Sequence, residues 1–357
     1  GHAILPRSMQ LLLYILGIGL GVFLLVKSAD WFTDAAVSIA YRLNVPDIII
    51  GATLVSLATT LPEFAVSVTA AMNRQVEMAV GNAVGSTIVN IGLILGLCIV
   101  LSPMGVGRKG FLRSSLGLFF VCLIFTCMGY AFPEGTRWAG VVMLVCLAVY
   151  LAANIRSAMP ARKPDAPRTQ DAGEPAREAL LEELASETSV DGAQRVELAT
   201  GLTTGRIIAY FILGSVGVIA GSKLVVYCAE HLALAAGISK QVIALTLVAL
   251  GTSTPELVIS LTAIIKRQRG LSIGNIIGAN ILNLAWVLGV SSLIMVVPFD
   301  AQNLHFDIPV MLLMTVLLFV FGFTGKKLNR WEGLVLLAVY AAYLAVLFTV
   351  YRAPAVV

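Results

Sequence analysis

Long apolar blocks dominate this chain and predict membrane-spanning helices. Apolar positions follow neither the alternation of a half-buried strand nor the narrow stripe of a surface helix. Blocks of about 18 residues or more are long enough to cross a bilayer. A helix satisfies its own backbone hydrogen bonds in lipid, so we predict an all-α integral membrane protein. Ten transmembrane helices are predicted, at roughly 10–30, 46–72, 76–101, 111–131, 136–156, 205–231, 240–265, 270–297, 308–325 and 330–352.

Composition agrees with a membrane location. Of the 357 residues, 58% are hydrophobic and only 12% are charged, whereas a soluble domain carries about 25% charged residues. The net charge of +4 is small, and we expect contact with the lipid bilayer and none with nucleic acid. The five cysteines fall in apolar spans, which favours packing over a disulfide or zinc site. No prosthetic group is expected, and the oligomeric state stays open.

The chain divides into four predicted segments. Residues 1–8 resemble a remnant of an expression tag that precedes a native start at Met9. Residues 9–156 and 205–357 each contain five predicted spans, and the stretch at 31–42 either extends the first span or forms a short interfacial helix. Residues 157–204 are rich in proline and charge, which predicts a mostly flexible loop.

One motif occurs twice. The segment Thr53-Leu-Val-Ser-Leu-Ala-Thr-Thr-Leu-Pro-Glu63 is matched 193 positions later by Thr246-Leu-Val-Ala-Leu-Gly-Thr-Ser-Thr-Pro-Glu256. The segments Gly81-Asn-Ala-Val-Gly85 and Gly274-Asn-Ile-Ile-Gly278 match at the same offset. Because each half has an odd number of spans, the second half enters the membrane from the opposite side. We therefore predict two inverted-topology five-helix repeats, an architecture typical of secondary transporters.

Basic residues in short loops predict the orientation, since they concentrate on the cytoplasmic side. We expect both termini outside, the loop at 157–204 in the cytoplasm, and a plasma or inner membrane as the location. The side predicted to be cytoplasmic carries most of these residues, among them Arg42, Arg108, Lys109, Arg113, Arg156, Arg206, Lys266, Arg267, Arg269, Lys326, Lys327 and Arg330. The other side carries Arg74, Arg137, Lys240 and Arg352.

Two carboxylates stand in the middle of predicted spans, where a charge is costly and points to function. Glu63 follows Pro62, and Glu256 follows Pro255. Proline lacks the N–H that bonds the carbonyl four residues earlier, so each helix should break and free carbonyl oxygens beside its carboxylate. Freed carbonyls next to a carboxylate suit a dehydrated cation.

Helical spacing adds further oxygen atoms to both sites. One predicted face carries Ser56, Thr59, Thr60 and Glu63, and its equivalent carries Ala249, Thr252, Ser253 and Glu256. On the following spans, the faces carry Asn82, Ser86 and Asn90, and Asn275, Ala279 and Asn283. We interpret Asn82 and Asn275 as makers of interhelical hydrogen bonds. An all-oxygen set suits hard cations, and dehydration favours Ca²⁺ or Na⁺ over Mg²⁺.

These paired motifs resemble the alpha repeats of the sodium/calcium exchanger superfamily, strongly over 51–97 and 244–290. The resemblance implies that Glu63 and Glu256 stand at the centre of four ion sites, and that the first and sixth spans slide over the remainder. It implies hydroxyl ligands at Thr59, Thr60, Thr252 and Ser253, and backbone-carbonyl ligands at Ser56 and Ala249. It implies further ligands at Ser86 and Asn90 on the third span, and Asn283 stands at the position equivalent to Asn90 in the second half.

Two positions depart from the pattern of many members of the superfamily. Ala279 stands where they have serine, and Asn283 stands where they often have aspartate. The absent carboxylate should lower the capacity for protons or for an extra cation. A stoichiometry of three Na⁺ per Ca²⁺ and any K⁺ co-transport therefore stay open.

We expect a cation antiporter, not an enzyme, that exchanges Ca²⁺ for Na⁺ at Glu63 and Glu256. A Ca²⁺/H⁺ antiporter on the same fold is the alternative, with the two glutamates as proton carriers. A membrane hydrolase would need an activated nucleophile or a metal-binding motif, and a channel would conduct without a counter-ion. Lys27 and Lys223 are interpreted as snorkelling to the interface, and His231, His305 and Asp307 as residues of outer loops.

Overall fold

The computed structural model describes residues 7–43, 45–74, 76–105, 108–158, 202–235, 249–324 and 327–350. Among them, eight helices are long and apolar enough to cross a membrane, and a ninth span consists of two segments, Asp47–Thr59 and Leu61–Met72, that meet at a bend of 48°. The chain is therefore an all-helical, multi-pass membrane protein, apart from one short pair of strands.

The first half of the chain forms α1 (Arg7–Arg42), α2 (Asp47–Ile50), η1 (Gly51–Val55), α3 (Ser56–Thr59), α4 (Leu61–Met72), α5 (Val76–Val89), η2 (Asn90–Leu95), α6 (Gly96–Leu101), β1 (Met104–Gly105), α7 (Arg108–Ala131) and α8 (Arg137–Ala158), where η denotes a π-helical turn. The second half forms α11 (Thr204–Ala235), α13 (Ala249–Thr252), α14 (Thr254–Ile265), α15 (Arg269–Leu282), η4 (Asn283–Val287), α16 (Leu288–Ile294), η5 (Asn303–Asp307), α17 (Ile308–Thr324), β2 (Lys327–Leu328) and α18 (Arg330–Val350). Strands β1 and β2 pair antiparallel.

The predicted spans agree with these helices where the chain is described. The stretch at 31–42 belongs to α1, so it extends the first span. The predicted span at 240–265 falls partly outside the described residues, and its described part comprises α13 and α14.

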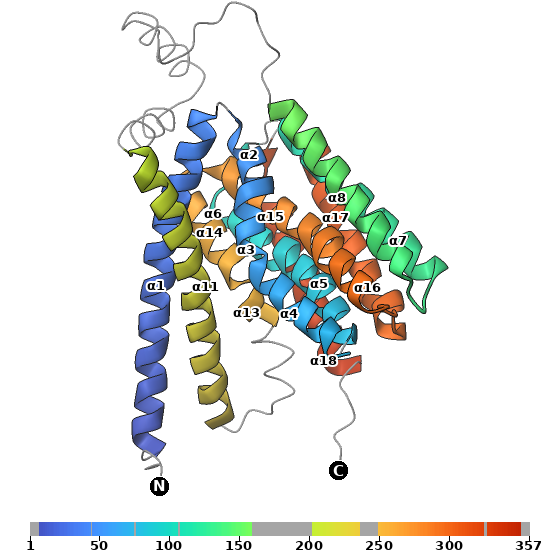
Figure 1. The fold of residues 1–357 in the computed structure, drawn as a ribbon, viewed down its shortest axis with the longest axis horizontal. Helices are drawn as coiled ribbons and strands as arrows, with labels where there is room; N and C mark the ends of the chain where they lie inside the picture. Colours follow the sequence, from blue (N-terminus) through green and yellow to red (C-terminus); the bar gives the residue numbers. More distant parts are fainter. Residues whose placement is uncertain are drawn as a thin grey trace, which may run out of the picture.

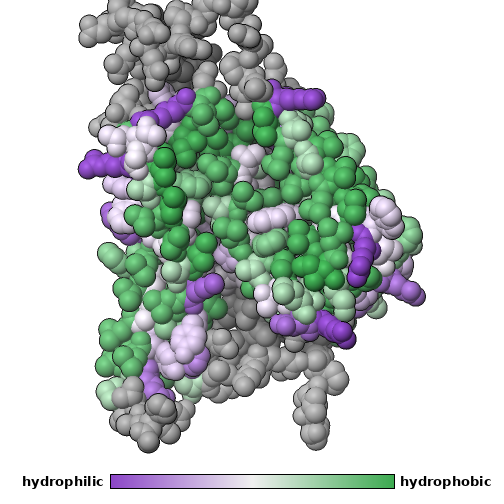
Figure 2. Space-filling view, in the orientation of Figure 1, coloured by the Kyte–Doolittle hydropathy of each residue, from purple (hydrophilic) through white to green (hydrophobic). Residues whose placement is uncertain are grey.

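The helices divide into a central group and a peripheral pair. Helices α1 and α11 lie side by side along one edge of the molecule (Figure 1). The spans at Met78–Leu101 and Arg269–Ile294 are 72% and 83% buried, against 11% for the first span. Hydrophobic side chains cover the middle of the visible face, and hydrophilic ones gather towards its upper and lower ends (Figure 2). The motif-bearing helices thus occupy the interior of a lipid-facing bundle.

Both motif helices break where the prolines predict. The chain leaves regular α-helix at Thr60 (φ −80°, ψ −1°) and restarts at α4, with Pro62 in the first turn. It does the same at Ser253 (φ −87°, ψ 7°) before α14 and Pro255. Proline cannot bond the carbonyl four residues earlier. The carbonyl thereby freed at Gly251 accepts a hydrogen bond from Ser222 Oγ at 3.0 Å, which ties α13 to α11.

Contacts between helices recur at the repeat offset. A Cβ placed on Gly96 would lie 3.1 Å from the Gly333 carbonyl oxygen, and one placed on Gly140 would lie 2.5 Å from that of Gly289. Gly289 is the equivalent of Gly96 at the motif offset of 193 positions, and Gly333 is the equivalent of Gly140, so the two contacts are related by exchanging the halves. Cys122 Sγ lies 3.6 Å from Thr315 Oγ1, its own equivalent at that offset.

Three residues expected in outer loops lie in helices instead. His231 is in the last turns of α11, where its ring centroid lies 4.2 Å from that of Tyr227 with the two rings tilted by 43°. His305 and Asp307 belong to η5, ahead of α17. Asp307 is buried and accepts hydrogen bonds from Tyr343 Oη at 3.0 Å and Gln302 Nε2 at 3.2 Å. These polar partners make a carboxylate tolerable inside the bundle, which hydropathy alone does not reveal.

Candidate functional site

The first motif presents four polar side chains on one buried face. Glu63 and Thr60 are 0% exposed, as is Ser56, and Thr59 is nearly so. Ser56 and Thr59 are the first and last residues of α3, which precedes the break, and Glu63 lies in the first turn of α4 after it. The i, i+3, i+4, i+7 spacing therefore converges on one face despite the bend, as the sequence predicts.

The second motif meets the first inside the bundle. Glu256 is also 0% exposed. Ser253 Oγ lies 3.5 Å from Glu63 Oε1, and the hydroxyls of Thr59 and Thr60 face the Glu256 carboxyl group. The two carboxyl groups are close enough to interact electrostatically. Hydroxyl groups of each motif thus lie near the carboxylate of the other motif.

Several oxygen atoms of this cluster have no hydrogen-bond partner within the described part of the chain. A buried polar atom without a partner costs free energy, and a buried charge costs more. This set of unpartnered atoms includes oxygens of two carboxylates 193 positions apart in sequence, and a bound cation or bound protons would satisfy them. The unpartnered atoms are Glu63 Oε2, both carboxylate oxygens of Glu256, Thr60 Oγ1, Ser86 Oγ, Asn90 Oδ1, and both polar atoms of Asn283.

The third-span residues approach the site from neighbouring elements. Ser86 lies in α5, which packs against α13. Asn90 begins η2, which packs against α14, and Asn283 begins η4, which packs against α4. Asn90 Nδ2 donates to Asn280 Oδ1 at 3.0 Å. Ala249 is the first residue of α13, and its side chain is outside the described set.

The pair Asn82 and Asn275 joins helices. Asn82 Nδ2 donates to Ser67 Oγ at 2.9 Å, and its Oδ1 accepts from Thr252 Oγ1 at 3.3 Å. Asn275 Nδ2 donates to Ser260 Oγ at 3.2 Å, and its Oδ1 accepts from Thr59 Oγ1 at 3.2 Å. These are equivalent bonds in the two halves. The interpretation of both asparagines as interhelical hydrogen-bonding residues is confirmed.

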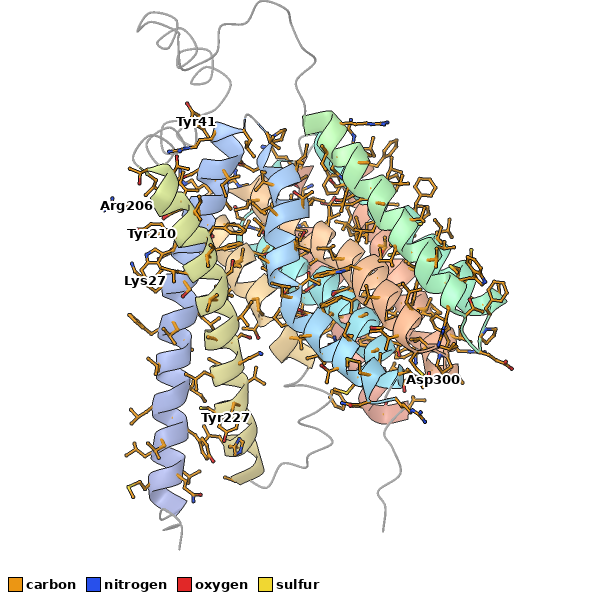
Figure 3. All side chains as sticks on the ribbon, in the orientation of Figure 1. Lys27, Tyr41, Arg206, Tyr210, Tyr227 and Asp300 are labelled. Carbon is orange, nitrogen blue, oxygen red and sulfur yellow. The ribbon has the colours of Figure 1, made fainter. Side chains whose placement is uncertain are left out.

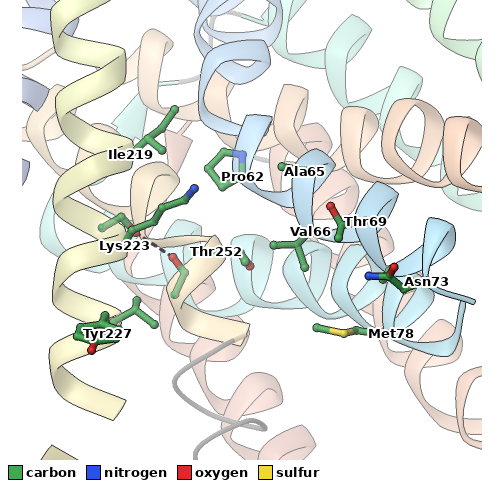
Figure 4. A pocket seen from close by; sticks show the side chains of 14 residues that line it. Pro62, Ala65, Val66, Thr69, Asn73, Met78, Ile219, Lys223, Tyr227 and Thr252 are labelled. Carbon is green, nitrogen blue, oxygen red and sulfur yellow. Dashed lines mark hydrogen bonds between the residues drawn. The ribbon is translucent and has the colours of Figure 1, made fainter. Parts of the chain in front are cut away.

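Sequence reasoning missed three features of the site. The π-helical turns that begin at Asn90 and Asn283 carry no sequence signal that we used, although such turns often mark functional sites. The Asn90–Asn280 bond crosses between halves, and Asn280 stood outside both motifs. A cavity of about 520 Å³ beside the break in the first motif is lined by residues of α4, α11 and α13 (Figure 4). A cavity between helices far apart in sequence depends on tertiary packing and not on a local pattern.

The cluster is suited to hard cations and not to a transition metal. The described residues contain no group of three or more histidine, cysteine or acidic side chains that could hold a metal ion. Carboxylate, hydroxyl, amide and carbonyl oxygens are the donors that Ca²⁺ and Na⁺ take. The donor chemistry therefore matches a transported cation.

Comparison with known proteins places relatives over both halves of the chain. The sequence profile of the family described as "Sodium/calcium exchanger protein" matches residues 13–156 and 206–349. The chain is 35% identical over 341 residues to the putative antiporter CaxA of Alkalimonas amylolytica, covering 92% of this chain and 97% of that protein. It is 32% identical over 353 residues to the sodium/calcium exchanger MaX1 of Methanosarcina acetivorans, with 92% and 97% covered.

A solved structure has the same architecture. The sodium-calcium exchanger NCX_Mj superposes with a TM-score of 0.76 at 31% identity, over 94% of this chain and 99% of that one. Profile, relatives and structure agree over both halves. The chain is a membrane protein of the sodium/calcium exchanger family.

Proposed function

We propose that this protein exchanges Ca²⁺ for Na⁺ across the membrane, with the ions held between Glu63 and Glu256. One observation carries the proposal: two fully buried carboxylates from different halves face one another's motif hydroxyls. Their combined charge of about −2 balances one Ca²⁺ or two Na⁺ in a medium of low dielectric constant. A site that binds either Ca²⁺ or Na⁺, but not both at once, couples the transport of one ion to that of the other.

The proposed ligand set is the one that the sequence predicts. Glu63, Glu256, Thr59, Thr60, Thr252 and Ser253 supply side-chain oxygens, and Ser56 and Ala249 supply backbone carbonyls. Support comes from the unpartnered oxygens of Thr60 and both glutamates. Ser86, Asn90 and Asn283 complete the set from the adjoining helices.

The proposed architecture is ten spans in two inverted repeats, 9–156 and 205–357, joined by a cytoplasmic loop at 157–204. The equivalent glycine contacts and the matched asparagine bonds support it. Both termini then lie outside. In this arrangement the peripheral helices α1 and α11 would move as a pair against the central group and expose the site to each side in turn.

Ion uptake into proteoliposomes tests the exchange. Vesicles loaded with Na⁺ and diluted into Na⁺-free medium should accumulate Ca²⁺, and collapse of the Na⁺ gradient should abolish the uptake. The alternative function is Ca²⁺/H⁺ exchange on the same fold, with Glu63 and Glu256 as the proton carriers. Uptake driven by a pH gradient without Na⁺ would replace the main proposal with this one.

A further inference from the structure

A lysine side chain lies in the cavity beside the proposed ion site. The cavity of about 520 Å³ is lined by Pro62, which precedes Glu63, and by Thr252, itself in the ligand set. It continues to Asn73 at the end of α4. In the proposed orientation that end faces outward, so the cavity is the outer vestibule of the site.

Lys223 extends from α11 into this vestibule. Its side chain reaches across the cavity towards Pro62 from the side opposite Val66 and Thr69 (Figure 4). Lys223 lies in the middle of α11 and not at either end. The preceding residue, Ser222, bonds the Gly251 carbonyl at 3.0 Å, which fixes this part of α11 beside the broken motif.

The ammonium group of Lys223 has no ion-pair partner among the described residues, in contrast to Lys266. Lys266 Nζ lies 2.8 Å from Asp34 Oδ1 and 3.2 Å from Asp30 Oδ1. Lys27, on the companion helix α1, lies over the Trp31 ring at 5.8 Å and does not line the vestibule (Figure 3). Within the described part of the chain, Lys223 therefore places an unpaired positive charge in this cavity.

Repulsion by a fixed charge depends on the charge of the ion. In Coulomb's law, the energy for Ca²⁺ is twice that for Na⁺ at the same distance. A resident ammonium group thus disfavours the divalent ion more strongly than the monovalent one. On the outer side, such a bias weakens the binding of each Ca²⁺ more than that of each Na⁺.

We propose that Lys223 is a specificity-determining residue that lowers the apparent affinity for Ca²⁺ relative to Na⁺ on the outer side. This inference rests on the proposed exchange function. It assigns no contact with the bound ion to Lys223, which acts through its charge in the vestibule.

The test measures exchange in oriented vesicles for wild type, Lys223→Gln, Lys223→Arg and Lys27→Gln. For Lys223→Gln, the outer Ca²⁺ concentration at half-maximal rate should fall about three- to tenfold, and that for Na⁺ about two- to threefold, after allowance for salt screening. The Ca²⁺ dependence on the inner side should not change. Lys223→Arg should behave as wild type because it keeps the charge, and Lys27→Gln should leave both dependences unchanged.

The outcomes separate the two proposals. Wild type without Na⁺-driven uptake would refute the exchange function. Normal wild-type uptake with an unchanged outer Ca²⁺ dependence in Lys223→Gln would overturn the role of Lys223 alone. An equal shift in Lys27→Gln would also overturn it, because the effect would then be one of general surface charge.

Discussion

The two halves of the protein share their scaffold and differ in their ligands. Asn82 and Asn275 make matched interhelical bonds, and the glycine contacts are matched as well. On the surfaces that we propose face the ions, Ser56 and Ser86 of the first half correspond to alanines in the second. Symmetric residues therefore maintain the fold, and asymmetric ones are available to set which ions bind.

The carboxylates themselves belong to the symmetric part, although their surroundings differ. Ser253 Oγ approaches Glu63, whereas neither oxygen of Glu256 has a hydrogen-bond partner within the described chain. If the halves form one joint site, neither glutamate can substitute for the other.

The largest effect is expected from neutralising either carboxylate. Glu63→Gln and Glu256→Gln should each weaken Ca²⁺ binding about 100-fold or more. The reason is that removing one partner of a buried pair of opposite charges, here a carboxylate paired with Ca²⁺, costs about 3–5 kcal/mol. Isothermal titration of detergent-purified protein with Ca²⁺ measures the loss. Glu134→Gln, in an exposed turn, is the matched control and should bind as wild type. Wild-type affinity in either site variant would show that the glutamates do not act together.

An intermediate effect is expected from an ion pair that joins the two halves and whose lysine has no equivalent in the first half. Lys266 joins the end of α14 to Asp30 and Asp34 of α1, and its equivalent in the first half is the exposed residue Asn73. A double-mutant cycle of Lys266→Met and Asp34→Asn should give a coupling energy of about 1 kcal/mol, discounted because the groups are partly exposed.

Thermal unfolding in detergent gives the stability of each member of that cycle. Asn73→Met is the control and should leave stability within about 0.5 kcal/mol of wild type, as is usual for surface substitutions. A coupling energy of zero would mean that α1 is not held to the central group by this pair. The difference between the halves would then be confined to the ligands.

Much of the site could be predicted from sequence because its signals are local. The proline breaks and the one-sided spacing around Glu63 follow from neighbours on one helix. The Asn90–Asn280 bond, the burial of Asp307 and the direction of Lys223 depend on packing between segments far apart in sequence. Lys223 shows the limit well, since a lysine in an apolar span fits snorkelling and vestibule lining equally until its neighbours are known.

The smallest effect is expected from restoring a carboxylate to the second half. Asn283 is buried, and its amide nitrogen has no acceptor within the described residues, so Asn283→Asp removes no hydrogen bond seen there. The introduced carboxylate needs a proton or a cation. As pH rises from about 6 to about 8, loss of that proton should raise apparent Na⁺ affinity about two- to fivefold relative to wild type.

The equivalent change in the first half should behave differently. Asn90 Nδ2 donates to Asn280 Oδ1 at 3.0 Å, so Asn90→Asp loses that bond and sets a carboxylate against a carbonyl oxygen. It should lower stability by about 1–3 kcal/mol, the cost of an unsatisfied buried polar group. Na⁺-dependent exchange across the pH range, with thermal unfolding of both variants, makes the comparison. Equal behaviour of the two would refute the idea that the ligands, and not the scaffold, break the symmetry of the halves.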